Sequence, residues 1–419
     1  MRFERLFAIA AGMVAAGCAG VSAQNLSDEA FGGVTPETCS AENPMLIRNV
    51  ADMEAMQTLS QYPGRDLYVK MEADINMAGM SWTPLNYADP YNVKIIFDGD
   101  GHTIRNFSCD YERYPSFFGV LYGECRNVVF ENAVITGGSS PCGVVGGYVG
   151  TGGKPGVVEN VAIVKGQVST GNNNSGGGIA GKTRNSTIRN CYVDADITTT
   201  YSEWWASIAS VAGDIPGDDV TIENCYAAGN IDGGTSANGA GIWGNVDWKA
   251  RITCSNNISW INLRGNWSSG LVGGRTKGTI TADNNYANKN AEIDLYENGQ
   301  PTSRYYYTGT VEGLTMPGAG NDNDRAMFGI LTTDAVAAAK TLGWDESVWT
   351  LEGDAPCLKI AYDAVSGVEA VNCSESATVV TSEYYDIAGR RLGHAPEAGI
   401  GIRRDTMSDG TVRSVKVAF

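Results

Sequence analysis

Histidine is almost absent from this chain, which contains 419 residues and only two histidines, His102 and His394. So few imidazoles leave little room for histidine-based metal sites or Ser-His-Asp chemistry. Positive charge is also scarce, because 30 lysines and arginines stand against 47 aspartates and glutamates, for a formal net charge of −17. An acidic chain does not suit a polyphosphate, so we predict no nucleic-acid partner.

Further signatures are missing. The sequence has no Gly-x-Ser-x-Gly turn and no Cys-x-x-Cys pair, which are typical of serine hydrolases and of zinc or thiol redox sites. After the N-terminal segment no apolar run reaches the roughly 20 residues of a membrane helix, so we predict no transmembrane helix. We also predict no cofactor; weak Ca²⁺ binding at the acidic loop 321–325 is the alternative to a plain solvated loop.

The N-terminus has the order of a secretory signal peptide. Arg2 and Arg5 precede the apolar run 6–16, and a small-residue cleavage site ends at Ala23. We expect cleavage after Ala23. A lipoprotein site is the alternative, in which acylated Cys18 becomes a lipid anchor. Both predict export from the cytoplasm.

Two short elements recur along the middle of the chain with a period near 30 residues. The first is an asparagine with apolar residues two before and one after it, and the second is an apolar pair followed by glycine. Copies of the first centre on Asn106, Asn132, Asn160, Asn190 and Asn224, and copies of the second begin at Phe117, Val144, Ile179, Val211, Ile242 and Leu271. Such a period indicates a solenoid.

The repeats favour an all-β fold. Short β-branched runs separated by glycine and asparagine leave no room for crossover helices, and stacked equivalent strands form a parallel β-helix. Asparagine suits a corner, because it tolerates left-handed backbone and its amide can hydrogen-bond along a stack. We predict a right-handed parallel β-helix of about seven turns, with helical end caps over 50–60 and 332–342, and a small C-terminal antiparallel β-sandwich.

The order of motifs resembles a known family. Segments 43–47, 81–85 and 97–104, with the Gly270-Leu271-Val272-Gly273 element, resemble the GLUG-repeat secreted proteins of Bacteroidetes bacteria, and 342–359 resembles their usual end cap. The tail after residue 378 resembles the sorting domain of type IX secretion; a plain accessory β-module is the alternative. The expected division is a signal peptide 1–23, a linker 24–43, an N-terminal cap 44–97, β-helix repeats 98–295, a C-terminal cap 296–360, a linker 361–377 and a β-module 378–419.

Catalysis has few candidates. Asp218-Asp219 is the one adjacent carboxylate pair considered for a hydrolase, and the acidic segment 98–102 is a candidate cation loop for a lyase. Both sit where the repeat pattern predicts a turn. Cys191 and Cys225 fall in one column on neighbouring turns, which predicts core thiols or, as the alternative, a stacked disulfide.

Aromatic residues are the better functional lead, because their rings stack on sugars. The predicted ligand-binding residues are Tyr201, Trp204, Trp205, Trp243, Trp248 and Trp267, whereas Trp260 is expected in the core. We predict a secreted or cell-surface, adhesin-like binding protein, not an enzyme, with a glycan or a surface protein as partner. The alternatives are a polysaccharide lyase or glycoside hydrolase, and a structural component of the envelope.

Overall fold

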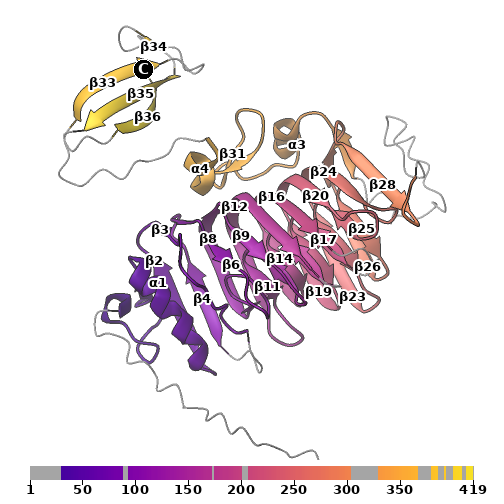
Figure 1. Cartoon of the computed structure of the whole chain (residues 1–419), viewed down its shortest axis with the longest axis horizontal. Helices are drawn as coiled ribbons and strands as arrows, with labels where there is room; N and C mark the ends of the chain where they lie inside the picture. Colours follow the sequence, from indigo (N-terminus) through magenta and orange to yellow (C-terminus); the bar gives the residue numbers. More distant parts are fainter. Residues whose placement is uncertain are drawn as a thin grey trace, which may run out of the picture.

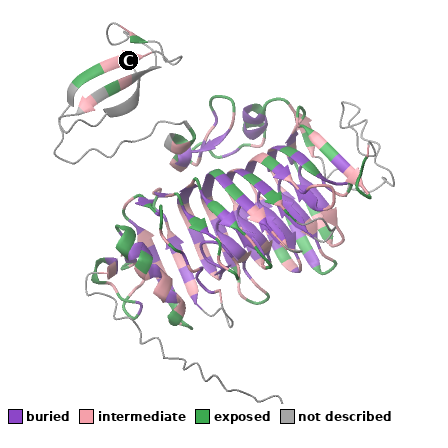
Figure 2. Ribbon diagram, viewed as in Figure 1, coloured by how far each residue is buried: buried purple, intermediate pink, exposed green. Residues whose placement is uncertain are grey.

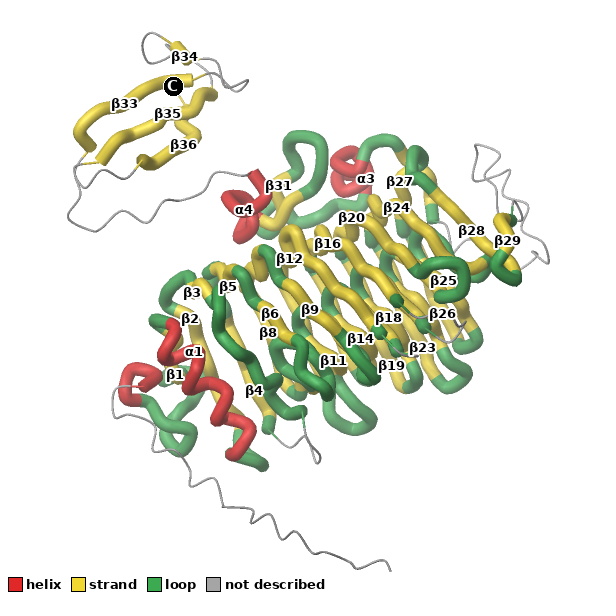
Figure 3. The backbone as a smooth tube through the Cα atoms, in the orientation of Figure 1, coloured by secondary structure: helices red, strands yellow, loops and turns green. Residues whose placement is uncertain are grey.

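The computed structural model describes residues 30–87, 93–171, 174–200, 206–302 and 329–366, and parts of the C-terminal module at 379–385, 391–392, 400–407 and 412–418. The body is a parallel β-solenoid of about seven turns (Figure 1). Short strands follow one another around each turn, and loops form the corners (Figure 3). The predicted parallel β-helix with a small C-terminal antiparallel module is therefore confirmed.

One large sheet, which we call the main sheet, forms one side of the solenoid. Its first column of strands is β1 (Met45–Ile47), β2 (Asp66–Met71), β4 (Lys94–Asp98), β8 (Gly123–Glu131), β12 (Gly156–Thr170), β15 (Ser186–Arg189), β19 (Asp218–Glu223), β23 (Ala250–Ser255) and β26 (Thr279–Asp283). The chain then bends into β3 (Ile75–Asn76), β5 (Thr103–Arg105), β16 (Tyr192–Thr199), β20 (Tyr226–Asp232), β24 (Ile258–Asn266), β27 (Tyr286–Asn288) and β30 (Ile330–Thr332). A third column holds β6 (Ser108–Cys109), β9 (Val134–Thr136) and β28 (Ile293–Glu297), with β29 (Gln300–Pro301) antiparallel to β28.

Two smaller parallel sheets close the other side. One contains β10 (Cys142–Gly143), β13 (Ser175–Gly177), β17 (Ser207–Ala209) and β21 (Asn238–Ala240). The other contains β7 (Val120–Leu121), β11 (Gly146–Val149), β14 (Ala180–Thr183), β18 (Ala212–Ile215), β22 (Trp243–Val246) and β25 (Gly273–Thr276). Apolar residues of all three sheets fill the interior, which Figure 2 shows as buried.

Asparagines in left-handed backbone form two different corners. Asn127, Asn160, Asn190, Asn224, Asn256 and Asn284 make one, and Asn106 and Asn132 make the other. The register separates them, because Phe130 lies opposite both Ile104 and Ile163, while Val158 lies opposite Cys125. The sequence pattern had placed five of these asparagines in a single column. Both corners carry an apolar residue two before and one after the asparagine, so the pattern alone does not distinguish them.

Glycines mark the corner between the two smaller sheets. Equivalent positions on six turns are Gly119, Gly147, Gly181, Gly213, Gly244 and Gly274. A Cβ on Gly213 would lie 2.5 Å from the Gly176 carbonyl oxygen and 2.8 Å from that of Gly181. Since backbone atoms of neighbouring strands occupy this space, only glycine fits.

The N-terminal end is covered as predicted by helix, with α1 (Val50–Met56) continuing into η2 (Gln57–Gln61). The side chain of Asn49 caps α1 by accepting from the Asp52 N–H at 3.0 Å. Asp52 is almost buried and accepts from the N–H of Phe31, in η1 (Ala30–Gly33), and from Arg48. Met53, Met56 and Leu59 are fully buried beneath this cap.

The second predicted cap has the expected helix, α3 (Ala335–Thr341), but lies elsewhere. Residues 335–366, which we call the flanking segment, continue through β31 (Trp349–Thr350), β32 (Cys357–Leu358), η4 (Lys359–Ala361) and α4 (Tyr362–Ser366). Helix α3 contacts β24 and β27, whereas η4 contacts β8 and β12 several turns away. The segment therefore runs along the side of the solenoid (Figure 1), not across its end. It does so because outward-facing Tyr192, Tyr226 and Ile258 form an apolar stripe that it buries.

The C-terminal module contains a four-stranded antiparallel sheet in the order β34-β33-β35-β36, formed by Arg391–Leu392, Val379–Tyr385, Ile400–Met407 and Val412–Ala418. The predicted sandwich is thus represented by one sheet in the part of the chain that the structure describes. None of the helices in that part is long and apolar enough to cross a membrane.

Candidate functional site

A cavity of about 640 Å³ opens beside the last turns of the solenoid. We call it the Trp267 cavity. Its lining consists of Thr235, Ser236, Asn238, Asn266, Trp267, Ser268, Arg275, Tyr296, Asn298 and Gly299. The lining combines aromatic rings, amides and hydroxyls with one charged side chain, that of Arg275. Such a mixture can hold a ligand that carries many hydroxyl groups and has apolar C–H faces.

Stacked turns fix the amides of this cavity. Asn266 ends β24 and Asn238 begins β21 on the preceding turn, and both are at least nine-tenths buried. The Asn266 amide nitrogen donates to the Asn238 side-chain oxygen at 3.0 Å and to the Ser236 carbonyl at 2.7 Å. The Ser268 hydroxyl lies 2.8 Å from the Asn266 side-chain oxygen. These polar groups are oriented in advance, which lowers the entropy lost when a ligand binds.

The aromatic residues come from the same turns. Trp267 follows the end of β24 and remains 44% exposed, and its backbone N–H donates to the Tyr296 carbonyl at 2.7 Å. Tyr296 lies directly opposite Asn266 in the register of β24 with β28. The Arg264 guanidinium sits 5.5 Å from the Tyr296 ring centroid. A hydrogen bond that Arg264 donates to Tyr296, together with the charge of Asp232, raises the pKa of Arg264.

The predicted aromatic residues have different fates. Of those that the structure describes, only Trp267 lines the cavity, while Trp248 is 75% exposed on another corner. Trp243 is fully buried in the core, where its indole nitrogen lies 3.4 Å from the Thr276 hydroxyl, so a surface ligand cannot reach it. Trp260, expected in the core, is half-buried on the outer face against the cluster beneath the flanking segment. Tyr201, Trp204 and Trp205 lie outside the described residues.

Sequence reasoning missed the other residues of the cavity. Asn238, Asn266 and Tyr296 are scattered in sequence, and only the stacking of turns brings them together. The 28-residue separation of Asn238 and Asn266 matches the repeat period. That match was an available signal for an amide pair on neighbouring turns.

The candidate catalytic carboxylates do not converge. The Asp218 carboxylate pairs with the Arg184 guanidinium at 2.9 Å. The Asp219 carboxylate pairs with a different guanidinium, that of Arg251, at 2.8 Å. The hydrogen bond from Arg251 lowers the pKa of Asp219. Each carboxylate is engaged by its own arginine, and the lowered pKa makes Asp219 a poor proton donor near neutral pH.

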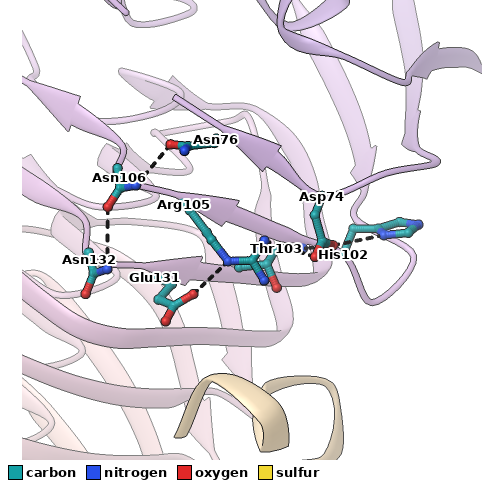
Figure 4. Close-up of polar contacts among 8 residues, drawn as sticks. All are labelled: Asp74, Asn76, His102, Thr103, Arg105, Asn106, Glu131 and Asn132. Atoms are coloured by element: carbon teal, nitrogen blue, oxygen red, sulfur yellow. Dashed lines mark hydrogen bonds and ion pairs between the residues drawn. The ribbon is translucent and has the colours of Figure 1, made fainter. Parts of the chain in front are cut away.

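The other candidate is the segment 98–102. Its histidine, His102, belongs to an ion network that joins three turns (Figure 4). His102 Nδ1 lies 3.1 Å from Asp74, whose carboxylate also accepts from the Thr103 N–H at 3.0 Å and from Arg105 at 3.0 Å. Arg105 donates in turn to Glu131 at 2.9 Å. Asp74 is thereby committed to structure, and no group of metal-ligating side chains was found among the described residues.

One further segment matches the sequence motif of a phosphate-binding loop but lacks the structure that the motif requires. Residues 176–183 have the spacing of a phosphate loop, ending in Gly-Lys-Thr. Such a loop requires a helix whose N-terminus faces the phosphate. Here the chain continues through strand β14, Lys182 pairs with Asp214 at 3.3 Å, and the Thr183 hydroxyl donates to the Val149 carbonyl. The segment is a solenoid corner.

Cys191 and Cys225 occupy equivalent positions on neighbouring turns, since the Tyr226 N–H donates to the Cys191 carbonyl. Both are fully buried free thiols. Burial raises the pKa of Cys225 well above its usual range, and the neighbouring Cys191 thiol raises it further. A buried, protonated thiol is a poor nucleophile.

The chain is similar to a protein of known structure. No protein-family model matches the chain, and no curated protein matches it. One solved structure, described as a "putative immunoglobulin A1 protease" from Bacteroides ovatus, is 30% identical with a TM-score of 0.60. The match covers 77% of this chain and 94% of that one. At this identity and coverage, the chain belongs to the same family as this Bacteroides ovatus protein.

Proposed function

We propose that this protein is a secreted or cell-surface binding protein that holds a carbohydrate in the Trp267 cavity. The observation that carries the proposal is the half-exposed Trp267 beside the oriented Asn238–Asn266 amide pair. A tryptophan ring can stack on the C–H face of a sugar, while amides and hydroxyls can bind its hydroxyl groups.

Export is part of the proposal. The signal peptide expected at 1–23 and the sorting-domain resemblance of the tail both favour a location outside the cell. Kinship with a Bacteroides protein is compatible with it. A mass measurement of the mature N-terminus distinguishes cleavage after Ala23 from acylation of Cys18.

Peptide-bond cleavage is the activity that the printed description of the Bacteroides ovatus protein suggests. In the described part of this chain, His102 is held by Asp74, and no serine, threonine or cysteine side chain is bonded to it. Cleavage of a polysaccharide is the other alternative, and the arginine-paired Asp218 and Asp219 do not favour it. Binding without turnover accounts better for these residues.

The experiment is a glycan array with the full mature chain, followed by titration of any glycan it retains. Three variants are compared: Trp267→Ala, Trp204→Ala/Trp205→Ala, and Trp248→Ala as an exposed tryptophan away from the cavity. Each retained glycan and purified immunoglobulin A1 are also incubated with the protein and analysed for cleavage products.

We expect Trp267→Ala to weaken binding by about tenfold or more, as removal of an aromatic anchor from a binding site does. The Trp248→Ala variant should bind a neutral glycan like the unaltered protein. Loss of binding only in the Trp204→Ala/Trp205→Ala variant would move the site to that loop. Cleavage products would instead identify an enzyme and overturn the proposal.

A further inference from the structure

A second exposed aromatic residue lies on another corner, between the β7–β25 sheet and the first column of the main sheet. We propose that Trp248, Lys249 and Lys277, which we call the Trp248 ridge, bind an anionic polysaccharide. This site is independent of the Trp267 cavity, with which it shares no residue.

The loops of two neighbouring turns build the ridge. Trp248 stands in a tight turn in which the Ala250 N–H donates to the Asp247 carbonyl at 2.9 Å. The loop of the next turn is fixed on it, because the Lys277 N–H donates to the Val246 carbonyl at 2.8 Å. The Lys277 ammonium lies 5.8 Å from the centroid of the Trp248 ring.

Trp248 is the most exposed large apolar side chain among the described residues, at 75%. An indole of this size normally contributes its area to the core or to an interface. Here the protein leaves it in water at the apex of a turn, with an ammonium group over its ring. A flat apolar ring with an adjacent cation matches a sugar ring that carries a negative group.

Charge along the corner supports an anionic ligand. Arg184, on an earlier turn of the same corner, is neutralised by Asp218, and Arg251, at the start of the strand that follows Trp248, is neutralised by Asp219. Lys249 and Lys277, in contrast, make no ion pair with any described carboxylate. Two such cations beside Trp248 stand out in a chain with a net charge of −17.

The geometry favours a polymer over a single sugar. Cationic side chains stand on four turns of this corner, at Lys154, Arg184, Lys249 and Lys277, whereas the turn at 216–217 has none. The ridge itself spans two neighbouring turns, and neighbouring turns of parallel strands are about 4.8 Å apart. An extended chain of acidic sugars running along the solenoid axis therefore meets a cationic side chain on both turns of the ridge.

The test uses the full mature chain with polygalacturonate, and with dextran as a neutral polymer. Affinities are compared for the unaltered protein, Trp248→Ala, and Lys249→Ala/Lys277→Ala. The exposed lysine variant Lys289→Ala is the matched control, and Trp267→Ala is measured in parallel. Melting temperatures establish that each variant is folded, and titrations at about 0.05 M and about 0.5 M NaCl measure the electrostatic contribution.

We expect both ridge variants to weaken polygalacturonate binding by about five- to tenfold, and the Lys289→Ala control to leave it unchanged. Binding should weaken at the higher salt concentration, and dextran should not bind. The proposal is overturned if the folded ridge variants bind polygalacturonate normally, or if the unaltered protein fails to bind it. Equal binding of poly(dT) would overturn the saccharide assignment. Because Trp267→Ala is measured in parallel, failure here is distinguishable from failure of the cavity proposal.

Discussion

The packing of Trp243 against Gly273 yields a quantitative prediction about the core. The register places Ala180, Ala212, Trp243 and Gly273 at equivalent positions on four successive turns. A Cβ added to Gly273 would overlap ring carbons Cζ2 and Cε2 of Trp243. The indole therefore occupies the space that the next turn leaves empty by having glycine.

Each single change should destabilise the solenoid. Trp243 is fully buried, and its truncation to alanine should lower the free energy of unfolding by about 3–5 kcal/mol, the usual range for a buried aromatic residue. Gly273→Ala should cost about 1–3 kcal/mol, because it forces the indole from its place. In the double variant the added methyl group enters the space that the indole has vacated.

The double variant should therefore be more stable than the sum of the two losses predicts. A coupling of about 1–3 kcal/mol is expected for residues in direct contact. Urea unfolding followed by circular dichroism measures the four proteins, with Gly138→Ala as a control glycine in open space. Losses that add to within about 0.5 kcal/mol would refute the claimed contact.

Three further predictions concern stability. Asn257→Ala should lower the free energy of unfolding by about 2–4 kcal/mol in urea titrations, because the buried Cys225 N–H loses its acceptor at 2.9 Å; a loss below about 0.5 kcal/mol would contradict this. Trp344→Phe should cost about 0.5–1.5 kcal/mol and speed proteolysis of the flanking segment, because the indole donates to the Asn256 carbonyl at 3.0 Å; unchanged digestion would argue against that anchor. Burial raises the pKa of Asp74, but the Thr103 N–H, His102 and Arg105 outweigh it and the net pKa is lowered. Its stabilisation is thus present above the unfolded pKa and lost as pH falls below about 4, so melting temperatures of Asp74→Asn should depend less on pH in that range.

The fold was predictable because its signals are periodic. Apolar residues around Asn160, Asn190 and Asn224 recur at turn length, and each lies at the same corner of the structure. The register was not predictable to the residue. Asn106 and Asn132 satisfy the same local pattern at another corner. Because apolar residues flank the asparagine in the same way at both corners, their spacing cannot distinguish one corner from the other.

The candidate site was predictable only in part, because the exposure of a side chain depends on the residues next to it on the adjacent turn. Trp243 and Trp248 are five residues apart, yet one is fully buried and the other is 75% exposed. Gly273 on the next turn creates the space for the first, and the apex of a loop holds the second. The flanking segment shows the same limit, since α3 was expected from its sequence, but the path of the whole segment along the solenoid depends on the stripe that Tyr192, Tyr226 and Ile258 form.

Binding of carbohydrate in the Trp267 cavity can be tested by a paired titration. A neutral glycan retained on the array is titrated calorimetrically into the unaltered protein, Trp267→Ala and Trp248→Ala under identical conditions. We expect Trp267→Ala to bind about tenfold or more weakly while melting normally, and Trp248→Ala to match the unaltered protein. Equal affinity of Trp267→Ala and the unaltered protein for every retained glycan would contradict binding in this cavity.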